Sequence, residues 1–377
     1  MINYIIVRFS RLRNRGLFLA GKPASAASLN HGIQVCDYSD KPTIIKNPTV
    51  ASLKRGTGGR SSFSGLVCTV FGASGFVGRY VCNRLGKIGS QLIVPYRGEH
   101  YEVKRLKLCG DLGQVLFHPF ELYDEDSIYR SVKYSNVVIN LIGRNYETKN
   151  FSFDDVNVKG AETIARISKE CGVERFVHLS CLAPKLMPGG SRYMKSKWEG
   201  EQLVREVFPE ATIIRPSVIY GQEDRFLNNY IPKIRLRNKS PNSWQNLPIS
   251  RTRTLFYKHA YRPERFTMAD LVDWIRNLLE VETAYYGYAR TDIEKDLLFK
   301  LRVSLAEAFT LSTPVFNLHW EALEMVSKGI PTLEDLGISP VRMAERIYWE
   351  LRPYRTDINI IDAIPEKDLP KPPQPVA

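Results

Sequence analysis

The stretch that decides the fold is Val67-Cys68-Thr69-Val70-Phe71-Gly72-Ala73-Ser74-Gly75-Phe76-Val77-Gly78, an apolar run that passes through a glycine-rich turn into a helical pattern. Gly72 permits a tight turn, Gly75 lets the backbone approach a pyrophosphate, and Gly78 allows the helix to pack closely on the strand. The start of the helix offers free N–H groups and partial positive charge to phosphates. The stretch therefore predicts a dinucleotide site, and a tight turn without a ligand is the alternative.

Short apolar runs alternate with helical patterns after this turn. The apolar runs are Leu66–Phe71, Gln91–Pro95, Val115–Phe117, Asn136–Ile142, Arg175–Leu179 and Thr212–Ile214. The helical patterns are Phe76–Leu85, Tyr101–Leu108, a helix from Asp124, Phe153–Cys171 and Tyr193–Val207. Such alternation predicts an α/β fold, a Rossmann-type doubly wound parallel sheet.

The alternation stops after Tyr220, and the remaining chain shows helical patterns. These patterns are Thr267–Leu279, Ile293–Phe309, a short one around Trp320, and Pro340–Leu351. We therefore expect a smaller, mostly helical C-terminal lobe. The predicted organisation is a transit peptide (1–35), a linker (36–65), an NAD(P)-binding Rossmann domain (66–224), a basic connecting segment (225–265), the helical lobe (266–355) and an extended Pro-rich tail (356–377).

The N-terminal segment has the composition of an organelle transit peptide. The first acidic residue is Asp37, and five basic residues precede it: Arg8, Arg11, Arg13, Arg15 and Lys22. This pattern predicts import into mitochondria, with a basic arm as the alternative. Three of the arginines interrupt the apolar stretch, which makes a secretory signal a weaker prediction.

The basic charge of the chain is concentrated in the segment 225–265, which holds ten Lys and Arg residues against one acid, Glu264. We expect an anionic partner there, either phospholipid head groups or an acidic protein face, while a solvated loop is the alternative. An RNA contact through Trp244, Phe256, Tyr257 and Tyr261 is a further reading, although no nucleic acid is expected. No apolar run reaches the ~18 residues of a membrane span, so no transmembrane segment is predicted.

The six cysteines form no Cys-x-x-Cys pair and no set with His at zinc-ligand spacing, so neither a metal site nor a disulfide framework is predicted. Cys68 lies in a predicted strand and is interpreted as a core residue.

The end of the second apolar run sets the expected cofactor. A residue about 20 positions beyond the glycines contacts the ribose, where an acid favours NAD and an arginine favours the 2′-phosphate of NADP. Here the run ends with Tyr96-Arg97, which favours NADPH, while Glu99 keeps NAD open as an alternative.

Tyr193 and Lys197 stand four residues apart on a predicted helix, hence on one face, and Ser180 ends the fifth run. A lysine beside a tyrosine lowers the pKa of the phenol and makes it a proton donor for hydride chemistry. Tyr129 and Lys133 share the spacing but fall on an outer helix, away from the edge that faces a cofactor.

Several motifs together resemble the atypical or extended short-chain dehydrogenase/reductase family. They are the glycine turn, Asn140-Leu141-Ile142-Gly143, Asn157-Val158-Lys159-Gly160, Tyr193-x-x-x-Lys197 and Arg215-Pro216-Ser217-x-x-Tyr220-Gly221. Further stretches, in 95–98, 111–114, 136–151 and 223–228, are similar to a branch of that family that forms accessory subunits of mitochondrial NADH:ubiquinone oxidoreductase, complex I. The likeness is close over residues 66–230 and weaker in the lobe.

The resemblance implies a non-catalytic subunit on the matrix side of the inner membrane, with a structural NADPH and other complex I subunits as partners. It implies a role in assembly or stability of the junction between the matrix and membrane arms. The implied cofactor-binding residues are Gly72, Ala73, Ser74, Gly75, Phe76, Val77, Gly78, Tyr96, Arg97, Leu141, Ile142, Ser180, Tyr193, Lys197 and Pro216, and no metal ligands are implied. Ser180, Tyr193 and Lys197 would then be vestigial catalytic residues.

The chain departs from the family pattern in one place. No strand and helix with a Val-Asp-Val-type segment are found between Lys233 and Arg265. We therefore expect a sheet edge and substrate lobe that are either abbreviated or rebuilt by the basic segment, which weakens the case for a formed substrate pocket. The alternative function is a free-standing mitochondrial NADPH-dependent reductase or epimerase, with Tyr193 as the acid, Lys197 as its activator and Ser180 as an orienting donor.

Overall fold

The computed structural model describes residues 54–181, 192–216, 219, 221, 223–224, 227, 247–248, 254–256, 265–279, 290–291, 343–354 and 371–373. The predicted transit peptide, the helices expected at Ile293–Phe309 and around Trp320, and most of the basic segment and of the tail lie outside these residues. The domain boundaries therefore stay predictions.

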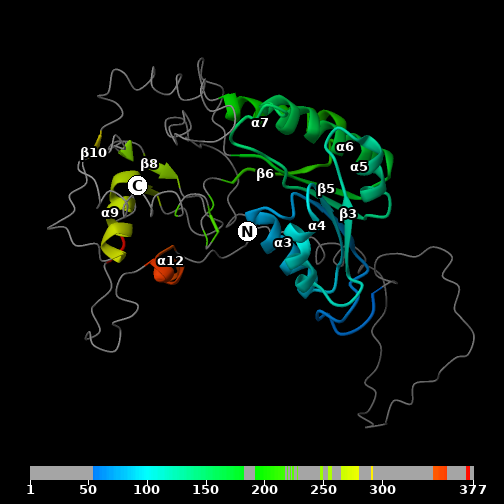
Figure 1. Cartoon of the computed structure of the whole chain (residues 1–377), viewed down its shortest axis with the longest axis horizontal. Coiled ribbons are helices and arrows are strands. Elements are labelled where there is room, and N and C mark those ends of the chain that lie inside the picture. The colour runs from blue at the N-terminus through cyan, green and yellow to red at the C-terminus, as the bar shows by residue number, and fades with distance from the viewer. Residues whose placement is uncertain are drawn as a thin grey trace, which may run out of the picture.

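A six-stranded sheet forms the centre of the protein, with the order β3-β2-β1-β4-β5-β6 and every pair parallel (Figure 1). Its strands are β1 Val67–Phe71, β2 Gln91–Tyr96, β3 Val115–Pro119, β4 Val137–Asn140, β5 Arg175–Leu179 and β6 Thr212–Ile214. This is the strand order of a doubly wound dinucleotide-binding sheet, in which the order reverses between β1 and β4. All six apolar runs are confirmed as strands, and so is the α/β fold class.

Helices connect these strands. They are α3 Phe76–Lys87, α4 His100–Val103, the 3-10 helix η1 Lys104–Cys109, α5 Glu125–Val132, the π-helix η2 Asp154–Lys159, α6 Gly160–Glu170 and α7 Arg192–Val207. The helix expected from Phe153 is confirmed, but its first part is a π-turn. Parallel neighbours require such crossovers, because the chain must return to the same end of the sheet before the next strand.

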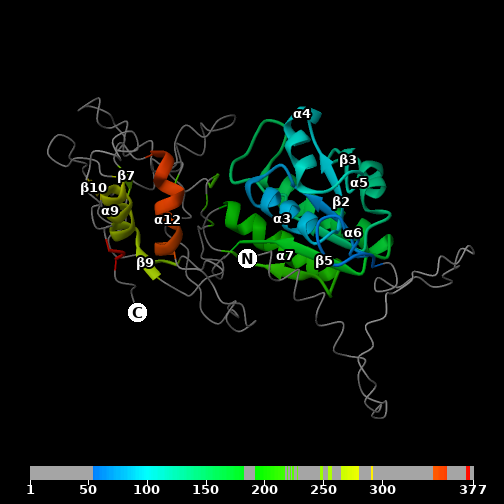
Figure 2. The ribbon, with the colours of Figure 1, turned by 90° about the horizontal axis from the view of Figure 1, so that it is seen from below.

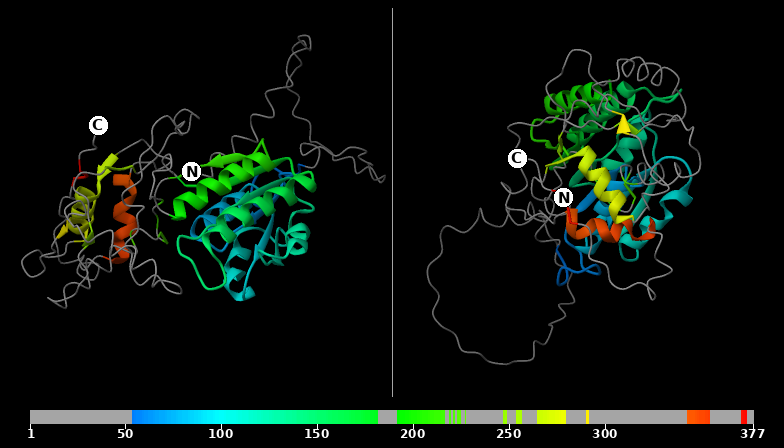
Figure 3. Two further views of the ribbon diagram at one scale, coloured as in Figure 1. Left: turned by 90° about the horizontal axis from the view of Figure 1, so that it is seen from above. Right: turned by 90° about the vertical axis from the view of Figure 1, so that its left-hand side faces the viewer.

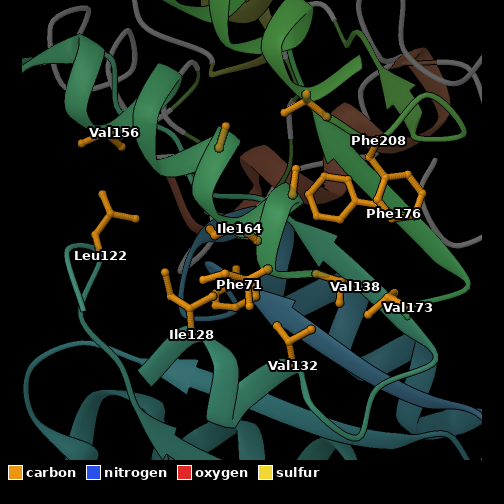
Figure 4. Packing of buried hydrophobic residues seen from close by; sticks show 14 residues of the cluster. Phe71, Leu122, Ile128, Val132, Val138, Val156, Ile164, Val173, Phe176 and Phe208 are labelled. Atoms are coloured by element: carbon orange, nitrogen blue, oxygen red, sulfur yellow. The ribbon is translucent and has the colours of Figure 1, made fainter. Parts of the chain in front are cut away.

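The helices cover both faces of the sheet because side chains alternate along β1. Cys68 and Val70 pack with α3, α4 and η1 in one apolar cluster. Phe71 faces the opposite side and packs with α5, α6 and α7, where Ile128, Val138, Ile164 and Phe176 surround it (Figure 4). Figure 3 shows α6 and α7, in green, side by side over the sheet. Cys68 is thus a core residue, as predicted, and burial raises the pKa of its thiol to about 12.

The second cluster also encloses a small polar contact. Thr69 Oγ1 donates to the carbonyl of Ser131 at 2.8 Å and lies 2.5 Å from Ser135 Oγ. These bonds give the buried hydroxyl of Thr69 its hydrogen-bond partners. They also connect β1 to the C-terminal end of α5, which limits sliding of the helix over the strand.

The C-terminal part contains more strand than the sequence predicts. Its elements are β7 Leu247–Pro248, β8 Thr254–Phe256, β9 Arg265–Thr267, α9 Met268–Leu278, β10 Arg290–Thr291, α12 Met343–Leu351 and the 3-10 helix η4 Arg352–Tyr354. β8 and β9 pair antiparallel, while β7 and β10 pair parallel. The α9 and α12 helices lie together, away from the sheet (Figure 2). The two helices confirm Thr267–Leu279 and Pro340–Leu351, but the described part of the lobe is not purely helical.

The window 233–265, in which the family strand and helix were not found, is only partly described. Its described residues form β7 and β8, and β9 begins at Arg265 and leads directly into α9, the helix expected from Thr267. β9 itself was not predicted, because a strand of three residues is too short for an alternating pattern to stand out. The abbreviated or rebuilt substrate lobe stays a prediction.

Candidate functional site

The glycine turn joins β1 to α3 with the backbone that the sequence predicts. Gly72 has φ +76°, and a Cβ there would lie 3.0–3.2 Å from the backbone of Leu141 and Ile142. At Gly78 a Cβ would lie 2.4 Å from the carbonyl oxygen of Gly72, so only glycine fits under the turn. Both glycines are therefore required for α3 to start this close to the sheet.

The start of α3 is open to an anion. Gly75 is the N-cap residue, no side chain caps the helix, and the first turn contains no acid. Ser74 and Gly75 are exposed, whereas Ala73 and Gly78 are buried and Phe76 and Val77 are half-buried. An uncapped helix start with exposed N–H groups fits a pyrophosphate, because the ligand oxygens take the place of the cap.

Arg97 lies just beyond the end of β2, where a ribose 2′-phosphate is expected. Its guanidinium carbon lies 5.0 Å from the centre of the Phe151 ring, and the Phe151 ring stacks on Tyr123 at 5.2 Å with an angle of 7°. No carboxylate of the described residues lies within salt-bridge distance of this guanidinium. Tyr96 packs edge-on against His100 at the end of β2. The alternative residue, Glu99, is the N-cap of the short helix α4.

Lys197 lies buried on α7, with 4% of its surface exposed. Its Nζ donates to the carbonyls of Ile142 at 3.3 Å and Leu179 at 3.4 Å. Ile142 lies two residues after β4, and Leu179 is the last residue of β5. Burial lowers the pKa of Lys197 to about 8, and the Cys181 thiol nearby acts in the opposite direction. The lysine therefore connects the C-terminal ends of two strands through an ammonium group that holds its proton weakly.

Ser180 and Tyr193 flank this lysine. Ser180 is buried directly after β5, and its N–H donates to the carbonyl of Ile214 on β6. Tyr193 is half-buried at the start of α7, with its ring edge-on to Phe153 at 6.0 Å. Tyr129, the other tyrosine with this spacing, is exposed on α5, one of the helices that cover a face of the sheet.

The loop 141–143 brings the two parts of the predicted site together. Its first residues touch Gly72 on one side, and the carbonyl of Ile142 accepts from Lys197 on the other. A Cβ on Gly143 would meet Lys197 Nζ at 2.5 Å. The last predicted residue, Pro216, is buried after β6, beside Arg215, which forms an ion pair with the buried Glu201 of α7. The chain thus gathers these residues along the C-terminal edge of the sheet, the place where ligands bind in such folds.

Two buried polar residues at this edge were not predicted as site residues. Asn157 lies in the π-turn η2, where its Nδ2 donates to Ser196 Oγ at 3.0 Å while its Oδ1 has no partner among the described residues. His178 on β5 is 1% exposed, and Asn140 Nδ2 lies 3.4 Å from its Nδ1. Since an amide nitrogen only donates, Nδ1 accepts and the ring proton is on Nε2, which is unpartnered in the described structure. A polar residue inside an apolar strand run was the available signal for His178.

The described part of the chain contains no group of three His, Cys, Asp or Glu residues that could hold a metal ion. None of its helices is long and apolar enough to cross a bilayer.

The NAD dependent epimerase/dehydratase family matches residues 68–251 of this chain. Among solved structures, gox2253 superposes with a TM-score of 0.54 at 17% identity, over 76% of this chain and 98% of the other, which shows a shared fold.

Two curated relatives are more similar in sequence. "NADH dehydrogenase (ubiquinone) 1 alpha subcomplex subunit 9, mitochondrial" from Mus musculus is 40% identical over 81% of this chain and 85% of the relative. "NADH-ubiquinone oxidoreductase 40 kDa subunit, mitochondrial" from Neurospora crassa is 34% identical over 80% of this chain and 83% of the relative. The chain therefore belongs to the family of mitochondrial NADH dehydrogenase (ubiquinone) 1 alpha subcomplex subunit 9 proteins, built on an epimerase/dehydratase fold.

Proposed function

We propose that this protein is a non-catalytic accessory subunit of mitochondrial complex I that holds NADPH as a structural component. The observation that carries the proposal is the likeness, over 81% of the chain, to a protein named as a subunit of that enzyme. The predicted transit peptide supports a mitochondrial location. We place the subunit on the matrix side of the inner membrane, where it stabilises the junction of the two arms.

The glycine turn supports nucleotide binding. The turn leaves the start of α3 exposed, and no side chain caps this end of the helix. In this proposal the backbone of Ala73, Ser74, Phe76 and Val77 surrounds the phosphates, and Leu141 and Ile142 line the opposite wall. NADPH, when bound, would supply a hydride donor, but a structural role uses only its shape and charge.

The preference for NADPH rests on Arg97. An exposed guanidinium with no carboxylate partner among the described residues can bind a 2′-phosphate in a bidentate manner. A ribose 2′-hydroxyl would call for an acid instead. Glu99 is the only acid within the adjacent residues 97–101. It stands at the N-cap position of α4 without a side-chain cap hydrogen bond, so it is the residue through which NAD would be recognised instead.

The hydrogen bonds of Lys197 support a structural role. Burial lowers the pKa of Lys197 to about 8, so its ammonium group is still mostly charged at neutral pH and can donate to backbone carbonyls. Its two carbonyl partners hold the ends of β4 and β5 together. We infer that Lys197 supports the floor of the nucleotide site, with Ser180, Tyr193 and Pro216 around it.

A reductase or epimerase remains the second candidate, because one observation favours it. Ser180, Tyr193 and Lys197 converge on the same edge of the sheet, and a buried lysine with a lowered pKa is typical of catalytic sites.

Native electrophoresis of detergent-solubilised mitochondria separates the two candidates. A complex I subunit co-migrates with the assembled enzyme, whereas a free reductase migrates as a small species. A second measurement identifies the nucleotide that the purified protein releases when it is denatured. We expect NADPH or NADP, and release of NAD or of no nucleotide would contradict the proposed site.

The basic segment 225–265 is proposed to contact anionic phospholipid head groups. Its net charge of +9 gives a strong electrostatic attraction to an anionic leaflet. Flotation with vesicles of anionic and of neutral lipids tests this contact. Binding only to the anionic vesicles, and loss of binding in high salt, is the expected result.

A further inference from the structure

Arg97 rests on an aromatic platform supplied by a distant part of the chain. Phe151 belongs to the loop between β4 and η2, 54 positions after Arg97 in the sequence, and its ring lies 5.0 Å from the guanidinium carbon. Tyr123, which follows β3, stacks on Phe151 with nearly parallel rings. Phe151 therefore contacts residues of two other crossover loops, Arg97 after β2 and Tyr123 after β3.

The loop that carries Phe151 is tied down at several points. Thr148 and Phe151 exchange two backbone hydrogen bonds, of 3.0 and 3.3 Å. The side chain of Glu147 accepts from the backbone N–H of Phe153 at 3.2 Å and from Arg192 of α7 at 3.0 Å. Phe151 is thus held in place independently of Arg97.

We propose that Phe151 is a specificity-determining positioning residue, which holds the Arg97 guanidinium ready for the 2′-phosphate of NADPH. This inference rests on the proposed nucleotide site and adds the residue that tunes its selectivity. A guanidinium held over a ring meets it on one side, so the N–H groups that point away from the ring stay available for a phosphate. The platform also restricts a long exposed side chain before the ligand arrives, which lowers the entropy lost on binding.

The selectivity is predicted to depend on Phe151 and Arg97 as a pair. NADH lacks the 2′-phosphate, so it gains nothing from a positioned guanidinium. Loss of the platform should therefore weaken NADPH binding while leaving NADH binding unchanged. A cation–aromatic contact at an exposed site changes affinity by roughly two- to fivefold.

The test compares the dissociation constants of NADPH and NADH for the full-length protein and its variants, from the fluorescence of the reduced nicotinamide. Phe151→Leu should weaken NADPH binding by roughly two- to fivefold and leave NADH binding unchanged. Phe151→Tyr keeps the ring and should retain the preference. Arg97→Met should remove the preference, and adding Phe151→Leu to it should have no further effect on the NADPH/NADH ratio.

Tyr134→Leu is the matched control, because Lys133 lies over the Tyr134 ring at 5.2 Å and forms a contact of the same kind after α5. This control should leave both dissociation constants unchanged. Equal weakening of both nucleotides by Phe151→Leu, or no change in either, would overturn the inference while the nucleotide site stands. A wild-type protein that binds neither nucleotide would instead refute the proposed function.

Discussion

Gly75 and Gly78 stand three residues apart in one turn, yet a side chain meets very different surroundings at the two positions. At Gly75 a Cβ would approach only the carbonyl oxygen of Gly72, at 3.3 Å, and the backbone angles, φ −72° and ψ 170°, suit any residue. Gly75→Asp should therefore fold, because aspartate is a favoured N-cap residue. Its carboxylate would occupy the place of the phosphates, and we expect nucleotide retention to be lost, measured by release on denaturation.

Gly78→Ala is the contrasting variant. Its Cβ would lie 2.4 Å from Gly72 O and 2.6 Å from Ala73 Cα, both in the backbone. We expect it to lower the free energy of unfolding by about 3 kcal/mol, as overpacking against rigid atoms does. Full nucleotide retention by Gly75→Asp, or unchanged stability of Gly78→Ala, would show that the turn is not built as described.

His178 is expected to make stability depend on pH. Burial lowers the pKa of His178 to about 3, and the charge of Lys197 acts in the same direction. Between the folded value and the ordinary value near 6.5, the unfolded chain binds a proton that the folded chain does not, so stability rises with pH across this window. Acidification from pH 7 to pH 5 should thus remove about 2 kcal/mol through this residue.

His178→Gln tests this assignment by chemical denaturation at both pH values. Glutamine keeps an acceptor near Asn140 but does not titrate, so the difference between pH 7 and pH 5 should shrink by about 2 kcal/mol. An undiminished pH dependence in this variant would assign the effect to other groups.

The packing of α7 on η2 depends on the absence of a side chain at Gly200. A Cβ there would lie 2.0 Å from the carbonyl oxygen of Asn157, which belongs to the backbone of the π-turn. Gly200→Ala should lower the free energy of unfolding by about 3 kcal/mol or more, since neither helix can move without disturbing the sheet. Gly59→Ala, at a position where a Cβ meets nothing within 4 Å, is the control and should be close to neutral. Thermal unfolding of both variants measures the difference.

Elements that repeat a hydrophobic period could be predicted from the sequence, whereas those without a period could not. The runs that became β1 to β6 are apolar because helices bury both faces of the sheet, so each one stands out locally. The π-turn at Asp154–Lys159 has the same pattern as an α-helix, and its extra residue per turn shows only in the backbone. β9 was missed because a strand of three residues carries no periodic signal.

Nucleotide binding should stabilise the whole protein, and the nucleotide with the higher affinity should stabilise it more. A ligand that binds only the folded state, at 100 times its dissociation constant, adds about 2.7 kcal/mol. For a domain of this size that corresponds to a rise in melting temperature of roughly 5–10 °C. NADPH should give this shift, NADH at equal concentration a smaller one, and Arg97→Met should make the two shifts equal.

Only part of the candidate site could be predicted from the sequence. The glycine turn and Arg97 could be predicted because each acts within one local motif. The sequence did not predict three features: the contact of Arg97 with the Phe151 ring, the carbonyl partners of Lys197 and the burial of His178. All three depend on which crossovers meet at the sheet edge. These contacts join residues more than 15 positions apart, and no local pattern encodes them.

The outer strand β3 ends in Pro119, and this has a consequence for the solubility of the chain. An edge strand exposes unpaired backbone groups that can recruit the edge of another molecule, but proline has no N–H to offer. At Pro119 a foreign strand would find no backbone donor, so the last position of this edge cannot be paired. The proline thereby disfavours strand-to-strand aggregation of a newly made copy on this side of the sheet.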